Sequence, residues 1–243
     1  MLKPRMSLVV IGLIATLIIF SGCDQSPLEK YDPRNFLISE YLFNGDANDL
    51  SGNNLHGTIY GAQLTTDRFG NPNSAFLFDG DDYISTPHID LYNSDTLSFS
   101  VWIMMSDFEY WPRILWKGKV PAEGKTSTFD LYFQTQFNEI RFDVTDSLIN
   151  FWQYTAVPEK LQSDTWYHIA GIYDGKKQIL YFNGSPVDTL IKDFKVLDND
   201  EPLLIGTGEI ERYFRGKIDD LRFFNVILSE KEILDLYLER RAP

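Results

Sequence analysis

Short segments in which apolar and polar residues alternate recur along this chain, and they constrain its fold more than any other feature. Leu97, Phe99 and Val101 alternate with Ser98 and Ser100, the period of two that is typical of a strand with one buried face. No strand–helix–strand rhythm and no fixed-period repeat accompanies these segments, so the sequence predicts an antiparallel all-β fold. Further predicted strands are residues 129–133, 139–144, 167–173, 178–182 and 217–224.

Tight turns are predicted between these segments. Residues 79–82 read Asp-Gly-Asp-Asp, and Asp-Gly and Asn-Gly pairs occur at residues 174–175 and 183–184. These residue types tolerate the positive φ angles that tight turns require. The pair at 174–175, followed by the apolar segment 178–182, predicts a β-hairpin. We expect about 12 to 14 strands arranged as a two-sheet sandwich.

One helix is predicted, close to the C-terminus. Ser229 followed by Glu232 has the spacing of a capping box, in which each side chain accepts a hydrogen bond from the other residue's backbone N–H. Leu228 and Ile233 occupy the positions of a hydrophobic staple, and Leu236 continues the apolar stripe. We expect this short helix to cover an open end of the sandwich.

The N-terminus has the pattern of a secretory signal. Lys3 and Arg5 precede an apolar run at residues 8–20, which is short of the roughly 20 residues that span a membrane. Small residues then lead directly into Cys23, as in a bacterial lipobox, where this cysteine would be diacylated and begin the mature chain. An ordinary signal peptide beside an incidental thiol is the alternative.

The expected organisation is therefore a signal peptide at residues 1–22, a lipidated Cys23 with a proline-containing tether to residue 35, and one domain at residues 36–243. This organisation places the protein at the bacterial cell envelope, on either membrane, because two or three acyl chains anchor firmly. Acylation of Cys23 would leave no free thiol, since the chain has only one cysteine. Disulfides, thiolate catalysis and cysteine-bound metals are then excluded.

The chain is strongly acidic. It has 35 Asp and Glu against 22 Lys and Arg, and a formal net charge of −13. Removal of the predicted signal peptide would take away Lys3 and Arg5 but no acidic residue. This charge opposes binding to nucleic acid and to anionic headgroups, so the lipid itself would provide the membrane attachment.

Seven motifs follow one another along the chain, at residues 41–53, 57–58, 67–70, 75–84, 166–170, 180–184 and 216–225. In this order they resemble the laminin-G-like, concanavalin A-like jelly rolls of bacterial surface proteins. The resemblance extends from about residue 36 to residue 237. It implies an all-β, two-sheet antiparallel jelly-roll sandwich with one short C-terminal helix, and about six or seven strands in each sheet. The first and last strands would lie side by side.

A structural calcium ion is the cofactor that the resemblance implies. Residues 46–54 are rich in the hard oxygen donors that Ca²⁺ prefers. The family often holds this ion between the first loop and the last strand, which maps the expected ligands onto Asp49, Asn53, Asp219 and Asp220. Such a metal would clamp the fold. The alternative is an Asx-rich turn that satisfies its own backbone.

Two groups of aromatic residues are candidates for binding a sugar. Tyr110 and Trp111 lie in an expected long loop at residues 106–126, and Trp152 and Tyr154 lie in a predicted strand. Aromatic rings can stack on the C–H faces of a pyranose while polar neighbours fix its orientation. The alternative is that alternate aromatic residues of a strand face the core.

Catalysis finds little support in the sequence. Glucanases of this fold carry Glu, Asp and Glu at alternate positions of one strand. Glu139 and Asp143 come nearest to that pattern, but Arg141 stands between them and no second Glu follows. We therefore expect both acids to face solvent and assign no catalytic residue. His168 is expected to be a strand residue held by a hydrogen bond.

These observations favour a non-catalytic recognition domain on a lipid-anchored envelope protein. Carbohydrate is the favoured ligand, chiefly by analogy with the family. Two alternatives stay open: an adhesin or structural protein that binds an envelope protein, and a glycoside hydrolase whose acids do not follow the family pattern.

Overall fold

The structure is a computed structural model that describes residues 31–118, 127–149, 151–208 and 212–240. The chain divides into a unit of residues 1–31 and a unit of residues 32–243, and the second unit contains the β-strands. The predicted signal peptide, Cys23 and residues 24–30 of the predicted tether lie outside the described residues. In the described part, no helix is both long and apolar enough to cross a membrane.

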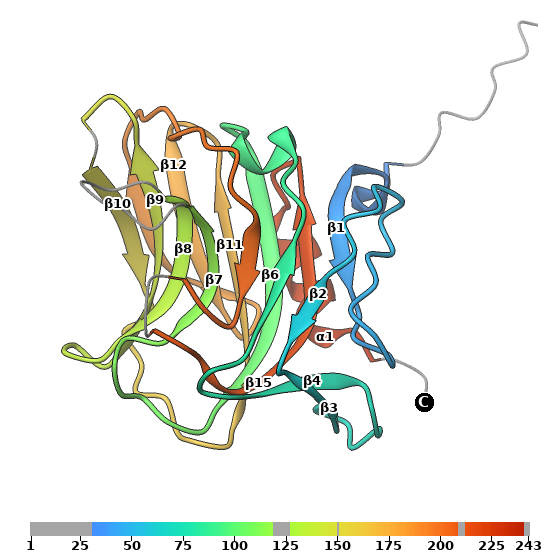
Figure 1. Cartoon of the computed structure of the whole chain (residues 1–243). Coiled ribbons are helices and arrows are strands. Elements are labelled where there is room, and N and C mark those ends of the chain that lie inside the picture. Colours follow the sequence, from blue (N-terminus) through green and yellow to red (C-terminus); the bar gives the residue numbers. More distant parts are fainter. Residues whose placement is uncertain (1–30, 119–126, 150, 209–211, 241–243) are drawn as a thin grey trace, which may run out of the picture. The chain divides into compact units, whose positions relative to one another are not determined.

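Fifteen strands in the described residues form two antiparallel sheets (Figure 1). The eight-stranded sheet has the order β13-β12-β11-β6-β15-β4-β3, and β1 pairs with β15 beside this path. Its strands are β1 (Leu37–Tyr41), β3 (Gln63–Thr65), β4 (Ala75–Asp79), β6 (Leu97–Met105), β11 (Trp166–Tyr173), β12 (Lys177–Phe182), β13 (Ser185–Ile191) and β15 (Arg215–Phe224).

The seven-stranded sheet faces the eight-stranded one, and its order is β10-β9-β8-β7-β14-β5-β2. Its strands are β2 (Thr58–Tyr60), β5 (Tyr83–Thr86), β7 (Arg113–Gly118), β8 (Ser127–Gln134), β9 (Glu139–Asp146), β10 (Phe151–Ala156) and β14 (Leu203–Ile205). Two short 3₁₀ helices, η1 (Pro33–Phe36) and η2 (Asp90–Asn93), lie outside the sheets.

The fold class predicted from the sequence is confirmed. Each of the six strands named above lies within an observed strand, and β11 and β12 form the expected hairpin. The first and last strands are antiparallel neighbours, with Tyr41 opposite Leu221. The molecule is a two-sheet jelly-roll sandwich.

Aromatic side chains fill the space between the sheets. Phe99 of β6 meets Phe142 of β9 edge-on, with ring centroids 4.9 Å apart, and Phe129 lies 5.6 Å from Phe223. Gly171 leaves room for this contact, because an added Cβ would lie 2.4 Å from a ring carbon of Phe99. Inward-facing residues of both sheets thus form one large core.

The helix α1 (Glu230–Leu238) begins with the predicted capping box. The Glu232 carboxylate accepts a hydrogen bond from the Ser229 N–H at 2.6 Å. Its expected position was wrong, because the helix lies against the outer face of the eight-stranded sheet. The reason is that outward-facing residues of that sheet, including Ala170 and Ile172, are apolar and pack with Ile233 of the helix.

The chain just before β1 is also attached to the sandwich. Asp32 caps η1, because its carboxylate accepts a hydrogen bond from the Arg34 N–H at 3.0 Å. The Arg34 guanidinium lies 3.0 Å from the Glu239 carboxylate, just beyond α1. Residues 32–35 of the predicted tether therefore contact the domain.

Candidate functional site

The loop between β6 and β7 exposes the first pair of predicted aromatic residues. Tyr110 is 79% exposed and Trp111 is 39% exposed. Both have left-handed backbone angles, with φ of 62° and 53°, which bulky residues rarely adopt and which often mark functional loops. The Trp111 N–H donates to Thr135 Oγ1 at 3.1 Å, and this hydroxyl donates to the Phe108 carbonyl at 2.8 Å.

Phe108 anchors this loop to the core. Its ring lies 4.9 Å from that of Phe133, which is buried in the core. On the exposed side, the Arg212 guanidinium lies 4.9 Å from the centroid of the Trp111 ring. The contacts of Phe108 and Trp111 therefore hold the loop in place, while the side chains of Tyr110 and Trp111 remain exposed to solvent.

A small polar pocket of about 130 Å³ opens beside Tyr110. Three loops meet here: β4–β5, β6–β7 and β14–β15. The first contributes Gly80, which has φ of +109°, an angle at which a side chain would be strained, and an added Cβ would displace Arg215 because it would lie 2.3 Å from Nε. Arg215 in turn lies 3.7 Å from the Asp107 carboxylate. The lining residues are Gly80, Asp107, Glu109, Tyr110, Pro112, Tyr213 and Arg215.

The second aromatic pair lies on the outer face of the seven-stranded sheet. Tyr154 of β10 is 47% exposed and pairs with Asp143 of β9, while the partly buried Trp152 pairs with Thr145. The guanidinium of Arg141 stacks on Tyr154, 4.2 Å from the ring centroid. Trp152 and Tyr154 thus belong to a different surface from Tyr110 and Trp111.

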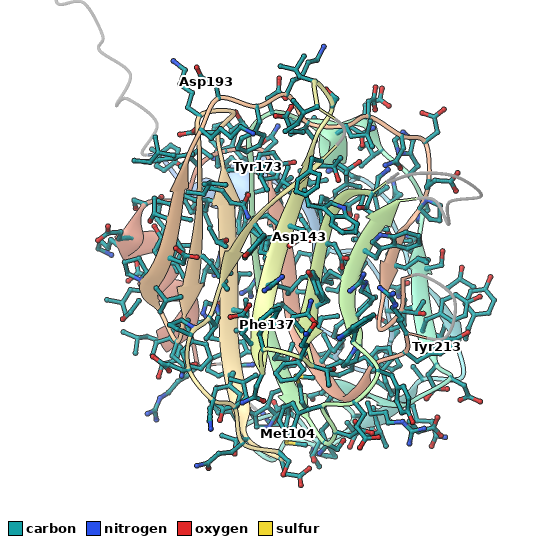
Figure 2. All side chains as sticks on the ribbon, turned by 90° about the vertical axis from the view of Figure 1, so that its left-hand side faces the viewer. Met104, Phe137, Asp143, Tyr173, Asp193 and Tyr213 are labelled. Atoms are coloured by element: carbon teal, nitrogen blue, oxygen red, sulfur yellow. The ribbon has the colours of Figure 1, made fainter. Side chains whose placement is uncertain are left out.

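Two carboxylates face each other at the centre of this outer face. Asp130 of β8 is the direct cross-strand partner of Asp143. Arg113 Nε lies 3.0 Å from an Asp130 oxygen, and the Tyr132 hydroxyl donates to Asp143 at 3.3 Å. Figure 2 labels Asp143 near the middle of the strands, far from the exposed Asp193.

The expectation that Asp143 faces solvent was wrong, since only 3% of the residue is exposed. Tyr132 and Arg113 lie near Asp143 on the same face of the sheet. Among the described residues, no donor is within hydrogen-bonding distance of its second oxygen, Oδ1. Burial, together with the charge of Asp130, raises the pKa of Asp143 to about 8. Glu139 is only partly exposed and pairs with Arg141 at 2.6 Å.

His168 is placed as the sequence predicts. It lies in β11, fully buried, and its Nε2 is 2.8 Å from the Ser100 hydroxyl. Burial lowers its pKa to about 3, so the ring is neutral at ordinary pH.

The four expected calcium ligands have other partners. The oxygens of Asp49 accept hydrogen bonds from the N–H groups of Glu40, Ser51 and Leu55, at 2.9 to 3.0 Å, and from the Ser51 hydroxyl at 2.8 Å. The Asn53 amide donates to the Ile38 carbonyl at 2.9 Å. These bonds hold the loop to itself through Ser51 and Leu55 and to β1 through Glu40 and Ile38.

Asp219 and Asp220 both contact the guanidinium of Arg68, at 2.7 Å and 2.5 Å. An internal cation therefore contacts two of the four residues that the resemblance implies as calcium ligands. Within the described ranges, the one group of three or more acids close enough to share a metal is Asp79, Asp81 and the buried Asp82. The calcium site itself stays a prediction.

Arg113, Asp130, Arg212 and Arg215 were not singled out from the sequence. Asp130 carried a usable signal, because it is the polar position in the alternating segment 129–133 and should face away from the core. Its proximity to Asp143 and Arg113 depends on how three strands align. The loop arginines carried no such signal.

Comparison with solved structures identifies similar folds. Domain 4 of AbnA, a GH43 extracellular arabinanase from Geobacillus stearothermophilus solved in complex with arabinotriose, is 20% identical, with a TM-score of 0.64 over 83% of this chain and 98% of that chain. The receptor binding domain of botulinum neurotoxin mosaic serotype C/D is 18% identical, with a TM-score of 0.67 over 85% of this chain and 51% of that one.

The binding domain of Paraclostridial Mosquitocidal Protein 1 is 16% identical, with a TM-score of 0.66 over 85% of this chain and 52% of that one. The chain thus spans about half the length of these two toxin domains. At such identities the likeness shows the fold alone. A search of curated protein sequences finds no match.

A family model described as the concanavalin A-like lectin/glucanases superfamily matches residues 78–234. This match covers more than half of the chain, and the sandwich of two antiparallel sheets is consistent with it. The chain belongs to the concanavalin A-like lectin/glucanases superfamily.

Proposed function

We propose that this protein is a non-catalytic carbohydrate-binding protein, held at the bacterial cell envelope by a lipid on Cys23. The observation that carries the proposal is the exposure of Tyr110, which lines a polar pocket, and of Trp111, the next residue in the chain. Exposed aromatic rings on a fixed loop provide flat faces for stacking on a sugar. Both residues also have left-handed backbone angles, which are strained for bulky side chains and often mark functional sites.

The chemistry of the pocket suits a sugar as the ligand. Asp107 and Glu109 offer acceptors for sugar hydroxyl groups, and Arg215 offers donors. A few polar groups beside aromatic faces are the usual composition of a small-molecule site. The arabinanase domain of similar fold was solved with arabinotriose, which supports the choice of saccharide as the ligand class.

The absence of catalysis is part of the proposal. Asp130 and Asp143, which are cross-strand partners, are 5% and 3% exposed, so a glycosidic bond would not reach them without rearrangement. Release of reducing sugars from any polysaccharide by the purified protein would overturn this part of the proposal.

The lipid anchor rests on the sequence of residues 1–23. Metabolic labelling with a palmitate analogue should tag the protein, and Cys23→Ser should abolish the label and release the protein from the membrane fraction. Unchanged membrane attachment of the Cys23→Ser variant would contradict the anchor.

Glycan binding is tested by screening the purified protein on a glycan array and titrating the best saccharide by calorimetry. Trp111→Ala should weaken binding about tenfold, which corresponds to the loss of one aromatic contact. Ile191→Ala is the matched control, since Ile191 is 81% exposed on the edge strand β13. Equal affinity of both variants, or no glycan binding by the parent, would contradict the proposal.

A second candidate function is the binding of a protein partner. The turn between β9 and β10 contains Leu148 and Ile149, which are 74% and 55% exposed, and Phe151 at the start of β10 is 57% exposed. Adjacent exposed apolar side chains are typical of interaction surfaces. Cross-linking in intact cells should then capture an envelope protein with the parent and with Trp111→Ala, but not with Phe151→Ser. Capture by all three would argue against this surface.

A further inference from the structure

Arg68 lies in the loop between β3 and β4, where its guanidinium is held in one position. Asp67 folds this loop, because its carboxylate accepts hydrogen bonds from the N–H groups of Phe69 and Asn71 at 2.8 Å. The guanidinium carbon lies 4.3 Å from the centroid of the Phe69 ring and 4.5 Å from that of Trp102. Two aromatic rings thus flank the cation, and only 5% of its side chain is exposed.

Two consecutive acids of β15 contact this one cation. In a regular strand, neighbouring side chains point to opposite faces. Here the pairing of β15 with β6 shifts between Asp219 and Arg222, and Asp220 adopts φ of 51°. The bulge therefore allows Arg68 Nη1 to lie 2.7 Å from Asp219 and 2.5 Å from Asp220. Both carboxylates are buried, with side-chain exposures of 0% and 3%.

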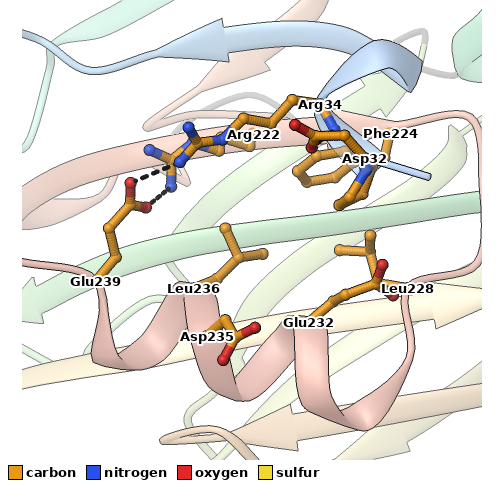
Figure 3. A pocket seen from close by; sticks show the side chains of 10 residues that line it. Asp32, Arg34, Arg222, Phe224, Leu228, Glu232, Asp235, Leu236 and Glu239 are labelled. Atoms are coloured by element: carbon orange, nitrogen blue, oxygen red, sulfur yellow. Dashed lines mark hydrogen bonds and ion pairs between the residues drawn. The ribbon is translucent and has the colours of Figure 1, made fainter. Parts of the chain in front are cut away.

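Arg68 also reaches the end of the last helix. Its Nη2 donates to the Glu239 carbonyl at 3.3 Å. The Glu239 carboxylate in turn contacts Arg222 at 2.8 Å and Arg34 at 3.0 Å, as Figure 3 shows at the end of α1. One guanidinium thus joins the β3–β4 loop, the bulge of β15 and the chain after α1.

We propose that Arg68 is the built-in cation of this domain and replaces the Ca²⁺ that the family resemblance implies at Asp219 and Asp220. Two buried carboxylates side by side require a positive charge, and a calcium ion would supply it only when bound. The Arg68 guanidinium is part of the chain and supplies this charge at all times, together with Arg222, whose Nη2 lies 3.8 Å from Asp220. The contacts that join the β3–β4 loop, β15 and the chain after α1 are then present at any calcium concentration.

The donor set around the expected site supports this assignment. Ca²⁺ takes about six to eight oxygen ligands, whereas the oxygens of Asp49 already accept four hydrogen bonds, three from their own loop and one from Glu40 of β1. The Asn53 amide group is turned toward the carbonyls of β1. Asp49 and Asp219 therefore serve two separate networks in place of one metal site.

The experiment measures the melting temperature of the purified protein and of three variants, each in EDTA and in millimolar CaCl₂. Arg68→Gln removes the charge but keeps most of the side-chain length. The triple variant Arg68→Gln, Asp219→Asn, Asp220→Asn also removes the carboxylates that the cation neutralises. Arg34→Gln is the matched control, because it breaks an ion pair whose arginine side chain is 63% exposed.

Calcium should leave the melting temperature of the parent unchanged. Arg68→Gln should lower it by about 10 °C, as expected for one partner removed from a buried ion pair in a domain of this size. The triple variant should recover part of that loss. The melting temperature of Arg34→Gln should differ from that of the parent by only about 2 °C. Stabilisation of the parent by calcium would overturn the proposal.

The triple variant separates charge from packing. If Arg68 acted only by filling space between Phe69 and Trp102, removing the two carboxylates would not restore stability to Arg68→Gln. A triple variant no more stable than the single one would therefore overturn the proposal. Because the readout is thermal stability, neither result depends on whether the protein binds a glycan.

Discussion

Replacement of Asp143 by asparagine should make the protein less sensitive to pH. Burial raises the pKa of this carboxyl group from 3.8 to about 8. Between these values the unfolded chain releases the proton while the folded protein keeps it, so the free energy of unfolding falls as pH rises. One pKa unit corresponds to about 1.4 kcal/mol. The fall across the whole window is therefore at most about 6 kcal/mol.

Asparagine has the same shape as the protonated acid and carries no charge at any pH. Its oxygen can still accept the Tyr132 hydroxyl, and its amide can donate to Asp130. The variant should thus keep the packing of the outer face, and its free energy of unfolding should no longer fall as pH rises. At neutral pH it should be more stable than the parent by a few kcal/mol.

Urea denaturation followed by tryptophan fluorescence, across about pH 5 to 8, measures both effects. The parent should lose stability with a slope approaching 1.4 kcal/mol per pH unit, and Asp143→Asn should be nearly flat. Asp193→Asn is the matched control, since Asp193 is exposed on a loop (Figure 2). Equal slopes for the parent and Asp143→Asn would refute the assignment of a buried, protonated carboxyl group.

Three further substitutions test the core, a buried lysine and the helix cap by the same denaturation assay. Gly171→Ala should destabilise the protein by about 1–3 kcal/mol because the added Cβ would lie 2.4 Å from Phe99; no loss would mean that the core adjusts freely. Burial lowers the pKa of Lys117 from 10.5 to about 8, so stability should rise with pH across that window, and Lys117→Met should abolish the rise; an unchanged rise would assign it to another group. Ser229→Ala should cost about 1 kcal/mol through loss of the N-cap, whereas a neutral result would mean that packing alone sets the start of α1.

The features that were predicted correctly from the sequence depend on residues that are close together in the chain. The alternation of residues 97–101 depends only on neighbouring positions, and it lies within β6 as expected. The capping box of Ser229 and Glu232 is likewise a contact within four residues. The helix position was missed although the signal existed. Residues 167–173 include apolar residues on both strand faces, Ala170 and Ile172 among them, which requires a cover on the outside of the sheet.

The candidate sites have causes that local patterns do not contain. Arg113, Asp130 and Asp143 come from three adjacent strands, and their meeting depends on register. The pairing of β7 with β8 shifts between Arg113 and Leu115 and again between Lys117 and Gly118, and each shift changes which residues are opposite. In the same way, Asp220 reaches Arg68 only because β15 bulges. Bulges of this kind leave little trace in a single sequence.

The distribution of strain points to the loop as the place where recognition would occur. Left-handed angles at Tyr110 and Trp111 cost on the order of 1–3 kcal/mol each, and neither exposed ring recovers that cost by core burial. The strain of Asp220, in contrast, is offset by its ion pair with Arg68. A strained conformation that brings no packing gain persists in a fold when it serves another purpose. At residues 110–111, the proposed purpose is the presentation of two rings to a ligand.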